Sequence, residues 1–486
     1  MAASDELTLV IDIGKSNAKL LMMDAAGTVV ERHSRPNASV PSPLGYPALD
    51  VHGLASWMQT TLCTSVNTRR CGHVIASTHG AALVALADGG LAWEPLDYEF
   101  DVRNDADAAL TAPPSSQDSF RETLSPDLPA GLNAARQLLW LQGKHPAAWN
   151  NTRLLLPYPQ YWAWLLSGVA CSEVSSLGCH THLWNPQRSA FSGLAKAEGW
   201  ATLFARLRSA WEVLGPVRAQ VSEAWGLPPS CQVHAGVHDS NACLARYLEH
   251  RPLALPQPHK LTLVSSGTWT VLMAPGASPD ALVAEKDMLG NVDVTGRLIP
   301  TARFMGGREF EAILGGAQPH AASLACLQQL IDSHTYAFPA FSHQGGPFSG
   351  TRGYVERQGA RLDAASVACM ADAQRATLAT IYCAQVTAWL ISYLWSDQPT
   401  GSHKVIIEGP LAHNLIYLQV LQSVLPNSTC YASTDELEGT ARGAWMLTRW
   451  GKDQTQDELK RVCTNQMAGM REYHDHWLES VKAATS

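Results

Sequence analysis

The chain has 486 residues, of which 46% are hydrophobic and 16% are charged, and its formal net charge is −8. This length is too great for one hydrophobic core and predicts two or three domains, and the composition excludes a disordered protein. The negative charge excludes a general attraction for nucleic acid or an anionic membrane. No apolar run approaches the ~20 residues that span a bilayer, so we expect no membrane partner.

The N-terminal residues and the cysteines indicate the cellular compartment of the protein. Asp5 and Glu6 lead directly into a β-rich segment, so no signal peptide is expected. The 11 cysteines are odd in number and scattered, with no Cys-x-x-Cys pair. This pattern favours buried free thiols in a reducing compartment over a disulfide framework or a zinc site, and we expect a cytoplasmic protein.

The first predicted element is a β-hairpin over residues 7–27, LTLVIDIGKSNAKLLMMDAAG. Apolar residues flank a short turn of Gly and small polar residues, which exposes backbone N–H groups that can wrap a phosphate. A similar sequence, LTLVSSGTWTVLMAPGA, returns at Leu261. The repeat indicates two related domains with one phosphate loop each; the alternative is two ordinary hairpins in a large α/β protein.

Hydrophobic periodicity and breaker residues predict the other elements. In chain order these are strands near 74–77 and 83–87, a Pro- and Ser-rich loop over 112–129, a helix over 132–143, a helix beginning at Asp239, a Pro-interrupted linker over 249–260, a long helix over 364–395, a strand over 404–408 and a polar helical segment over 457–483.

Two histidine pairs invite a metal-site interpretation: His180 with His182, and His234 with His238. The second pair has the helical i, i+4 spacing but lacks the Glu of His-Glu-x-x-His. We therefore expect structural histidines at both pairs.

Several segments, in order, resemble motifs of the FGGY carbohydrate kinases, which belong to the actin/hexokinase/Hsp70 superfamily. Residues 12–19 (DIGKSNAK) are similar to the first phosphate motif and residues 266–268 (SGT) to the second. Residues 405–414 (VIIEGPLAHN) are similar to the adenosine motif and are followed by EGTARGA at 438–444. Residues 236–242 (GVHDSNA) resemble the segment that carries the catalytic Asp. Members that act on L-rhamnulose and L-fuculose are the nearest in resemblance.

The resemblance implies an α/β fold of two actin-like (ribonuclease H-like) domains with an ATP and sugar cleft between them. The expected N-terminal domain, 1–248, carries the sugar-binding side, the first phosphate motif and the catalytic Asp. The expected C-terminal domain, 258–455, carries the second phosphate and adenosine motifs. A terminal helix within 456–486 is expected to pack back on the first domain, and the linker near Arg251–Gln257 to act as the hinge.

The implied cofactors are ATP and Mg²⁺, and the implied partner is a small sugar; a homodimer is compatible with the family. Asp12 ends a buried strand and suits a Mg²⁺ contact, directly or through water, although a turn-capping carboxylate is the alternative. Lys15 stands where the family usually has Thr, so a phosphate contact and a solvated turn lysine both stay open. The implied ATP-binding residues are Gly14, Lys15, Ser16, Asn17, Lys19, Gly267, Thr268, Gly306, Gly409, Pro410 and Asn414.

Asp239 is the implied general base. It precedes an amphipathic helical pattern, so the helix dipole favours its ionised form. Without the family motif, a plain N-cap would be the simpler interpretation.

The sugar pocket is expected around the turn after the 74–77 strand and the segment PLDYE at 95–99. Imidazole and carboxylate groups can share hydrogen bonds with adjacent hydroxyls, and an aromatic ring can cover an apolar sugar face. For Asp97 and Glu99, exposed surface charges are the alternative. The implied substrate-binding residues are Thr78, His79, Asp97, Tyr98, Glu99 and His238.

The sequence therefore predicts ATP-dependent phosphorylation of a ketose or deoxyketose such as L-rhamnulose or L-fuculose. The alternatives are a kinase of another ketose or polyol (xylulose, ribulose or glycerol-like) and a nucleotide-binding relative without sugar kinase activity. A dinucleotide oxidoreductase is set aside because no Gly-x-Gly-x-x-Gly follows the first strand.

Overall fold

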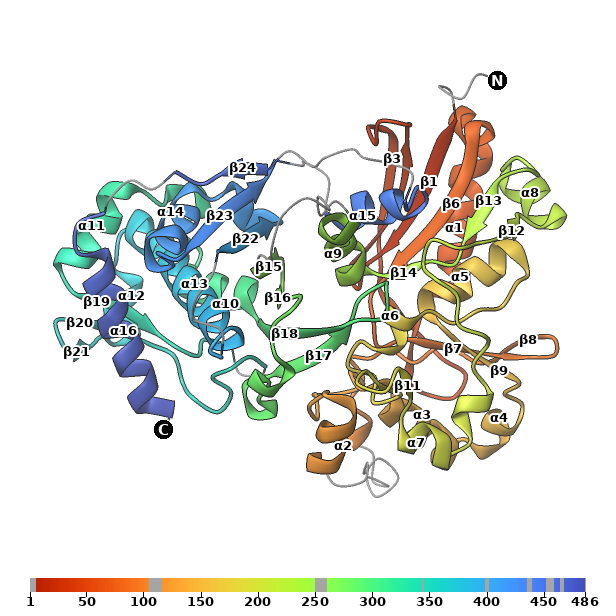
Figure 1. Cartoon of the computed structure of the whole chain (residues 1–486), viewed down its shortest axis with the longest axis horizontal. Coiled ribbons are helices and arrows are strands. Elements are labelled where there is room, and N and C mark those ends of the chain that lie inside the picture. The colour runs from red at the N-terminus through yellow and green to blue at the C-terminus, as the bar shows by residue number, and fades with distance from the viewer. Residues whose placement is uncertain are drawn as a thin grey trace. The chain divides into compact units, whose positions relative to one another are not determined.

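A computed structural model describes residues 6–104, 116–249, 260–342, 345–397, 402–434, 439–451, 459–463 and 467–485 of the chain (Figure 1). The chain divides into two compact units. Unit 1 comprises Met1–Leu253, Gly290–Leu298 and Leu437–Gln456, and unit 2 comprises Ala254–Leu289, Ile299–Glu436 and Asp457–Ser486. The predicted hinge near Arg251–Gln257 lies outside the described residues.

The centre of unit 1 is a mixed sheet in the order β12-β13-β6-β1-β2-β3. Strand β1 pairs with β2 in antiparallel and with β6 in parallel orientation, and all its residues are buried. Along β1, Ile11 joins one core cluster and Val10 another, as the alternation of a strand between two layers requires. The bounds are β1 (Leu7–Ile13), β2 (Asn17–Met23), β3 (Val29–Pro36), β6 (Cys71–Thr78), β12 (Val213–Pro216) and β13 (Gln232–His234).

Helices cover both faces of this sheet. Met58 of α1 (Val51–Thr64), Trp162 of α5 (Tyr158–Ser167) and Val221 of α8 (Ala219–Trp225) share a core cluster with Ile11. On the other face, α9 (Asp239–Glu249) and α15 (Gly439–Leu447) pack against β1 and β6.

The contact between α9 and α15 depends on one glycine. A Cβ atom at Gly443 would lie 1.8 Å from the carbonyl oxygen of Ala242, so a larger residue would push the two helices apart.

The sheet of unit 2 repeats the arrangement of unit 1. Its path β18-β16-β15-β22-β23-β24 again has a central hairpin, a third antiparallel strand on one side and parallel strands on the other. The repeated sequences thus form the central hairpins of two related domains, as predicted. The bounds are β15 (Lys260–Ser266), β16 (Thr270–Met273), β18 (Leu298–Phe304), β22 (His403–Glu408), β23 (Ser428–Ser433) and β24 (Leu459–Arg461).

The core of unit 2 contains α13 (Asp372–Leu394). Within the described part of the chain, it alone is long and apolar enough to cross a membrane, with a mean hydropathy of 1.3. However, 89% of its apolar window is buried, and it packs against α10 (Gly306–Leu314) and α14 (Leu415–Val424). This is the environment of a core helix.

Two local predictions are wrong. The segment expected to be a loop contains α2 (Ser116–Thr123), because its prolines flank these eight residues rather than interrupt them. The long helix predicted over 364–395 is divided into α12 (Ala364–Ala368) and α13, because Ala371 takes an extended conformation, with a ψ of 146°, and starts a new helix.

The expectation that the terminal helix packs on the first domain is also wrong. Helix α16 (Met470–Thr485) belongs to unit 2 and packs on β19 (Thr335–Phe338). The Tyr473 hydroxyl donates to the Thr335 carbonyl, and Trp477 Nε1 donates to Ala337 O at 2.9 Å. Buried indole and phenol groups need such acceptors, and the carbonyls of β19, an edge strand of its sheet, supply them.

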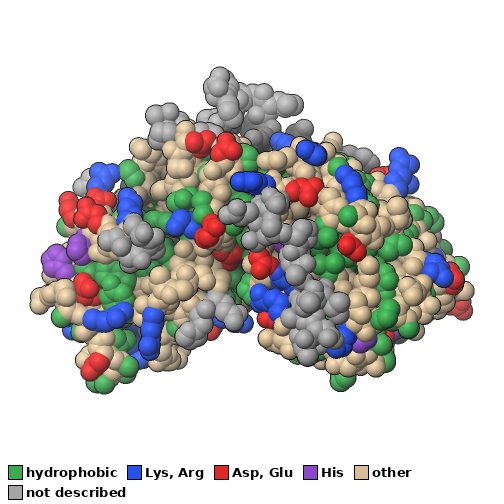
Figure 2. Space-filling view, turned by 90° about the horizontal axis from the view of Figure 1, so that it is seen from below, with side chains coloured by type: hydrophobic (Ala, Val, Ile, Leu, Met, Phe, Trp, Pro, Cys, Tyr) green, Lys and Arg blue, Asp and Glu red, His purple; other side chains and the backbone are tan. Residues whose placement is uncertain are grey.

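Charges of both signs are interspersed on the face of the molecule that Figure 2 shows. Among the described side chains drawn on that face, Lys and Arg form no continuous patch.

Candidate active site

Three parallel segments end together at one edge of the unit 1 sheet. In the register, Ile13 of β1 lies beside Thr78 of β6, which lies beside His238 of β14 (Val237–His238). Carboxyl ends of parallel strands are where α/β proteins bind ligands. The structure thus brings the first phosphate motif, the His79 turn and Asp239 to one edge, although up to 227 residues separate Asp12 from Asp239 in the chain.

The turn between β1 and β2 is tight and open to solvent at its tip. Gly14 N donates to Asn17 O at 2.9 Å, and Asn37 Nδ2 donates to Gly14 O at 2.8 Å. Ser16 and Asn17 are exposed. Asn37, which sequence reasoning missed, holds this turn from the far end of β3.

Asp12 and Lys19 face each other across the hairpin. They are paired in the antiparallel register, so their side chains lie on the same face of the sheet. Asp12 is buried, with 6% of its surface exposed. A buried carboxylate at a strand end, with a cation opposite, can hold a hydrated metal ion or orient a phosphate.

In the structure, Lys15 lies beside acidic side chains of the segment 95–99. Its ammonium forms an ion pair with Asp97 and lies 3.6 Å from Glu99 Oε2, and Ser39 also donates to Asp97. Burial raises the pKa of Asp97, but the hydrogen bonds from Lys15 and Ser39 outweigh it and hold the pKa below its ordinary value. Asp97 is therefore a buried anchor rather than a surface charge, whereas Glu99, with a side chain 60% exposed, is at the surface.

His79 presents an unused acceptor. Its Nδ1 lies 2.9 Å from Gly80 O, so this nitrogen carries the hydrogen and Nε2 has the lone pair. Nε2 is buried and has no hydrogen-bond partner among the described residues. Burial lowers the pKa of His79, which keeps the ring neutral. The rings of Tyr98 and Tyr158 lie 5.1 and 5.2 Å from the imidazole. This nitrogen can accept a hydrogen bond from a ligand hydroxyl.

Thr78 does not share this environment. It is fully buried, and its hydroxyl donates to the His79 carbonyl at 3.1 Å. Its side chain thus supports the turn from within.

Asp239 begins α9 and is held by its neighbours. Its Oδ1 accepts from Ser240 N at 2.6 Å and lies 3.3 Å from His238 Nε2. Asn241 Nδ2, which sequence reasoning missed, lies 3.0 Å from His238 Nδ1, on the opposite side of the ring. The imidazole is thereby oriented with Nε2 toward the carboxylate. The side chain of Asp239 is 30% exposed, so a ligand can reach it.

The groups around His238 favour a positive charge on its ring. Burial lowers its pKa, but Cys179, Asp239 and Glu173 together raise the pKa of His238 to about 9. Glu173 is fully buried and caps α6 (Val174–Leu177). In the imidazolium, Nε2 of His238 carries a hydrogen. In the neutral ring, the amide of Asn241 donates to Nδ1, so the hydrogen is again on Nε2. Nε2 therefore donates to Asp239 in both protonation states.

The His79 and His238 segments meet at Gly80. A Cβ atom there would lie 2.7 Å from Cys179 Sγ and 2.9 Å from His238 Nε2. A small cavity at this point is lined by residues that include His79, Tyr158 and His238. The imidazoles of His79 and His238 thus line the same cavity, and Asp239 is linked to it through His238.

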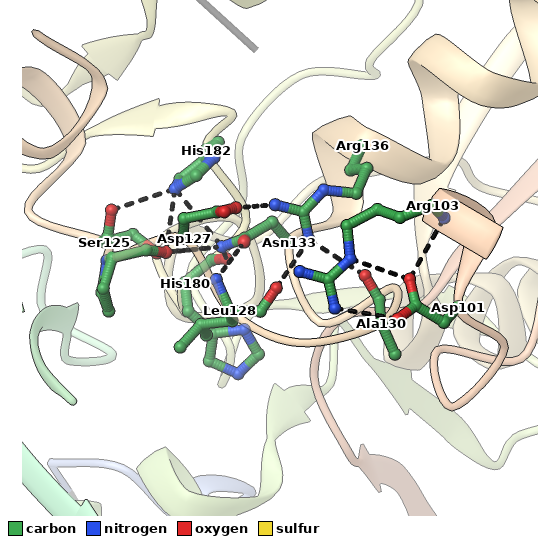
Figure 3. Close-up of polar contacts among 11 residues, drawn as sticks. Asp101, Arg103, Ser125, Asp127, Leu128, Ala130, Asn133, Arg136, His180 and His182 are labelled. Atoms are coloured by element: carbon green, nitrogen blue, oxygen red, sulfur yellow. Dashed lines mark hydrogen bonds and ion pairs between the residues drawn. The ribbon is translucent and has the colours of Figure 1, made fainter. Parts of the chain in front are cut away.

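A network of polar contacts holds the loop between α2 and α3 (Ala134–Lys144) in place (Figure 3). Arg136 donates to the carbonyls of Leu128 (2.6 Å) and Ala130 (3.0 Å) and forms an ion pair with Asp127. Asn133 Nδ2 donates to His180 O at 2.8 Å. Burial lowers the pKa of Arg136 to about 10, which leaves it a cation at neutral pH.

The loop reaches the candidate site through Gly131. Its N–H donates to Tyr98 O at 2.8 Å, and its carbonyl accepts from Gln137 Nε2 at 2.6 Å. Gln137 Nε2 also donates to Ala81 O at 2.7 Å, beside the His79 turn. Gln137 lies in the helix that the sequence predicts over residues 132–143, but sequence reasoning gave it no place at the site.

Three of the four histidines of the two pairs have contacts with backbone carbonyls, whereas His238 contacts Asp239. His180 Nδ1 lies 2.8 Å from Leu132 O, His182 Nε2 lies 2.9 Å from Ser125 O, and His234 Nδ1 lies 2.8 Å from Trp211 O. Among the described residues, no group of three or more His, Cys, Asp or Glu side chains could hold a metal ion.

In unit 2, three glycine turns meet at the end of β15. Gly307 N donates to Thr268 O at 3.2 Å, and a Cβ atom at Gly307 would lie 2.6 Å from Gly267 O. Gly409, with a φ of +77°, lies against Ser266, whose hydroxyl accepts from Leu411 N at 3.0 Å. The second phosphate motif, the Gly306-Gly307 pair and the adenosine motif thus form one backbone-lined surface.

The last two predicted nucleotide residues have visible structural roles. Pro410 occupies the first turn of η8 (Pro410–His413), and Asn414 caps α14 by accepting from Tyr417 N at 3.1 Å. Asn414 Nδ2 also donates to Thr380 Oγ1 at 3.2 Å.

Comparison with known proteins gives a consistent picture. Residues 258–457 match the family model for the C-terminal domain of FGGY carbohydrate kinases. A carbohydrate kinase from Novosphingobium aromaticivorans is similar over 99% of this chain and 100% of its own, with 32% identity and a TM-score of 0.83. A xylulose kinase from Lactobacillus acidophilus covers 99% of both chains at 13% identity, with a TM-score of 0.75. The predicted α/β fold of two actin-like domains is confirmed.

The similarity to a curated relative is narrower. The chain is 24% identical to an L-fuculokinase of Escherichia coli strain K12 over 295 residues. This match spans 57% of the chain and 58% of the relative's length.

Proposed function

Since this chain belongs to the FGGY family of carbohydrate kinases, we propose that it transfers the γ-phosphoryl group of ATP to a hydroxyl of a ketose or deoxyketose. The observation that carries the proposal is the convergence, in unit 1, of an exposed and oriented carboxylate, Asp239, with the unpartnered acceptor His79 Nε2.

Asp239 acts as the general base. An acceptor hydroxyl hydrogen-bonded to its free carboxylate oxygen would lose its proton to that oxygen as it attacks the γ-phosphorus in line. His238 positions Asp239 from one side, and the Ser240 N–H and the helix N-terminus stabilise its anion.

The acceptor sugar is recognised by groups of unit 1. His79 Nε2 accepts a hydrogen bond from a second hydroxyl, and the neighbouring Tyr98 ring covers an apolar face of the sugar. Lys15 and Ser39 already form an ion pair and a hydrogen bond with Asp97. We therefore assign Asp97 the role of holding the segment that carries Tyr98 in place.

The nucleotide phosphates bind the backbone N–H groups of the glycine turns. In unit 1 these lie in the turn that follows Gly14, whose own N–H donates to Asn17 O, and in unit 2 they are at Gly267, Thr268 and Gly306. Asp12 fits a hydrated Mg²⁺, which uses only one or two carboxylates alongside water and phosphate oxygens, and which when bound would neutralise charge on those oxygens.

The similarity to an L-fuculokinase supports L-fuculose, or the related deoxyketose L-rhamnulose, as the first acceptors to test. Another ketose or a polyol is the second candidate. A nucleotide-binding protein without kinase activity is the third; it would bind ATP without any need for Asp239.

The experiment is ADP release by the purified chain with ATP, Mg²⁺ and a panel of ketoses, deoxyketoses and polyols. One acceptor class should raise ADP release well above the rate without sugar, and Asp239→Asn should abolish that increase. ATP binding with no acceptor-dependent ADP release across the panel would refute the proposal.

A further inference from the structure

A cavity of unit 2 lies apart from the glycine turns. It has a volume of about 540 Å³ and lies between the end of α10, the hairpin β20–β21 (Tyr354–Arg357 and Ala360–Arg361) and α12. Its apolar wall consists of Ile313, Phe341, Val355, Leu362 and Val367. This volume suits a metabolite of sugar size or larger.

The charged side chains that line this cavity are cationic. Arg352, Arg361 and Arg375 line it, and its lining contains no Asp or Glu. Arg352 is exposed and has no hydrogen bond or ion pair with another described residue. Three guanidinium groups around one cavity repel one another unless an anion binds among them.

Two of these arginines are held in place. Arg375 donates to Gly315 O at 3.0 Å and to Asp372 Oδ1 at 2.7 Å, while its Nε is buried without a partner in the described chain. Arg361 stacks on the Tyr354 ring, with its Cζ 3.8 Å from the ring centroid. A planar guanidinium fixed by stacking loses less entropy when it binds a phosphate.

We propose that this cavity is a second ligand site that binds a small phosphate monoester, with the phosphate among the three arginines and the carbon skeleton on the apolar wall. Guanidinium groups bind phosphate through paired, charge-assisted hydrogen bonds. None of the residues assigned above to the nucleotide or the acceptor lines the cavity.

The site has a direct connection to the phosphate loops. Helix α10 begins at Gly306, beside Thr268, and its last turn supplies Ala312 and Ile313 to the cavity. A ligand that shifts this nine-residue helix would change the KM for ATP. This consequence, unlike the binding itself, rests on the proposed function.

The test is calorimetric titration of the full chain with phenyl phosphate, which joins one phosphate to an apolar ring. We expect saturable binding that persists at saturating ADP, and at least about tenfold weaker binding in the double variant Arg352→Gln/Arg361→Gln. Arg471→Gln, an exposed arginine of α16 in the same unit, is the matched control and should bind as the wild type does.

A second variant guards against a folding defect. Ala364→Glu places a carboxylate at the exposed edge of the cavity and should also weaken binding while the melting temperature stays unchanged. No binding up to about 10 mM, equal binding by all variants, or displacement of phenyl phosphate by ADP would each overturn the proposal. The titration needs no turnover, so failure of the kinase proposal would leave its result intact.

Discussion

Replacing the carboxylate of Asp239 with an amide is the sharpest perturbation of the candidate active site. Asp239→Asn keeps an oxygen that can accept from Ser240 N, at 2.6 Å, and from His238 Nε2, at 3.3 Å, so α9 should begin as before. What disappears is the charge and the ability to take a proton. With a side chain 30% exposed, the change leaves no buried cavity.

The expected loss follows from general-base catalysis, which contributes about 10²–10⁴ in rate. This corresponds to about 2.7–5.4 kcal/mol in the activation barrier. Turnover with the acceptor identified by the sugar panel should fall by that factor, whereas the Kd for ATP, measured by calorimetry, should change less than about twofold.

The matched control is Asp363→Asn in unit 2. Asp363 also caps a helix, accepting from Ser366 N at 2.7 Å, and is exposed. It should keep wild-type turnover. If Asp239→Asn also kept wild-type turnover, Asp239 would have no chemical role and would be a helix cap only.

Three further outcomes are expected. Gly267→Ala should weaken ATP binding. The chain should stay folded, because the added Cβ meets no atom closer than 3.7 Å. Gly89→Ala, with open space around it, is the control, and equal ATP affinity in both variants would remove the turn from the nucleotide site. His79→Phe, which lacks the acceptor Nε2, should raise the KM for the sugar about tenfold or more while the KM for ATP stays constant, and a parallel rise in both would contradict its role. Burial lowers the pKa of His182 to about 4, below the ordinary ~6.5, so stability present above pH 6.5 should fall by up to about 3 kcal/mol as the pH drops toward 4. Melting temperatures at pH 7 to 5 test this: wild type should lose more than His182→Gln, and an equal loss would refute it.

The sequence was most informative where backbone chemistry decides the structure. Gly14, Gly267 and Gly409 are at turns in which a side chain would crowd the backbone or the ligand, and a repeated hairpin sequence predicts a repeated fold. The strand that carries Asp12 was likewise predictable from its buried apolar run, and the helix that begins at Asp239 was predictable from its apolar spacing.

Contacts between distant segments could not be predicted in this way. The ion pair of Lys15 with Asp97 joins residues 82 positions apart, and neither local sequence indicates the other. The same holds for Asn37 and Asn241, single polar residues whose importance depends on the atoms opposite them. The place of α16 depended on which unit offered acceptors for Tyr473, and periodicity carries no such information.

The most direct test of the central claim is ³¹P NMR of the chain with ATP, Mg²⁺ and the acceptor that most increases ADP release. We expect the γ-phosphate signal to be replaced by a sugar phosphomonoester signal that grows in step with ADP, and we expect Asp239→Asn not to produce it. Inorganic phosphate as the sole new signal, formed at the same rate with and without sugar, would contradict the account.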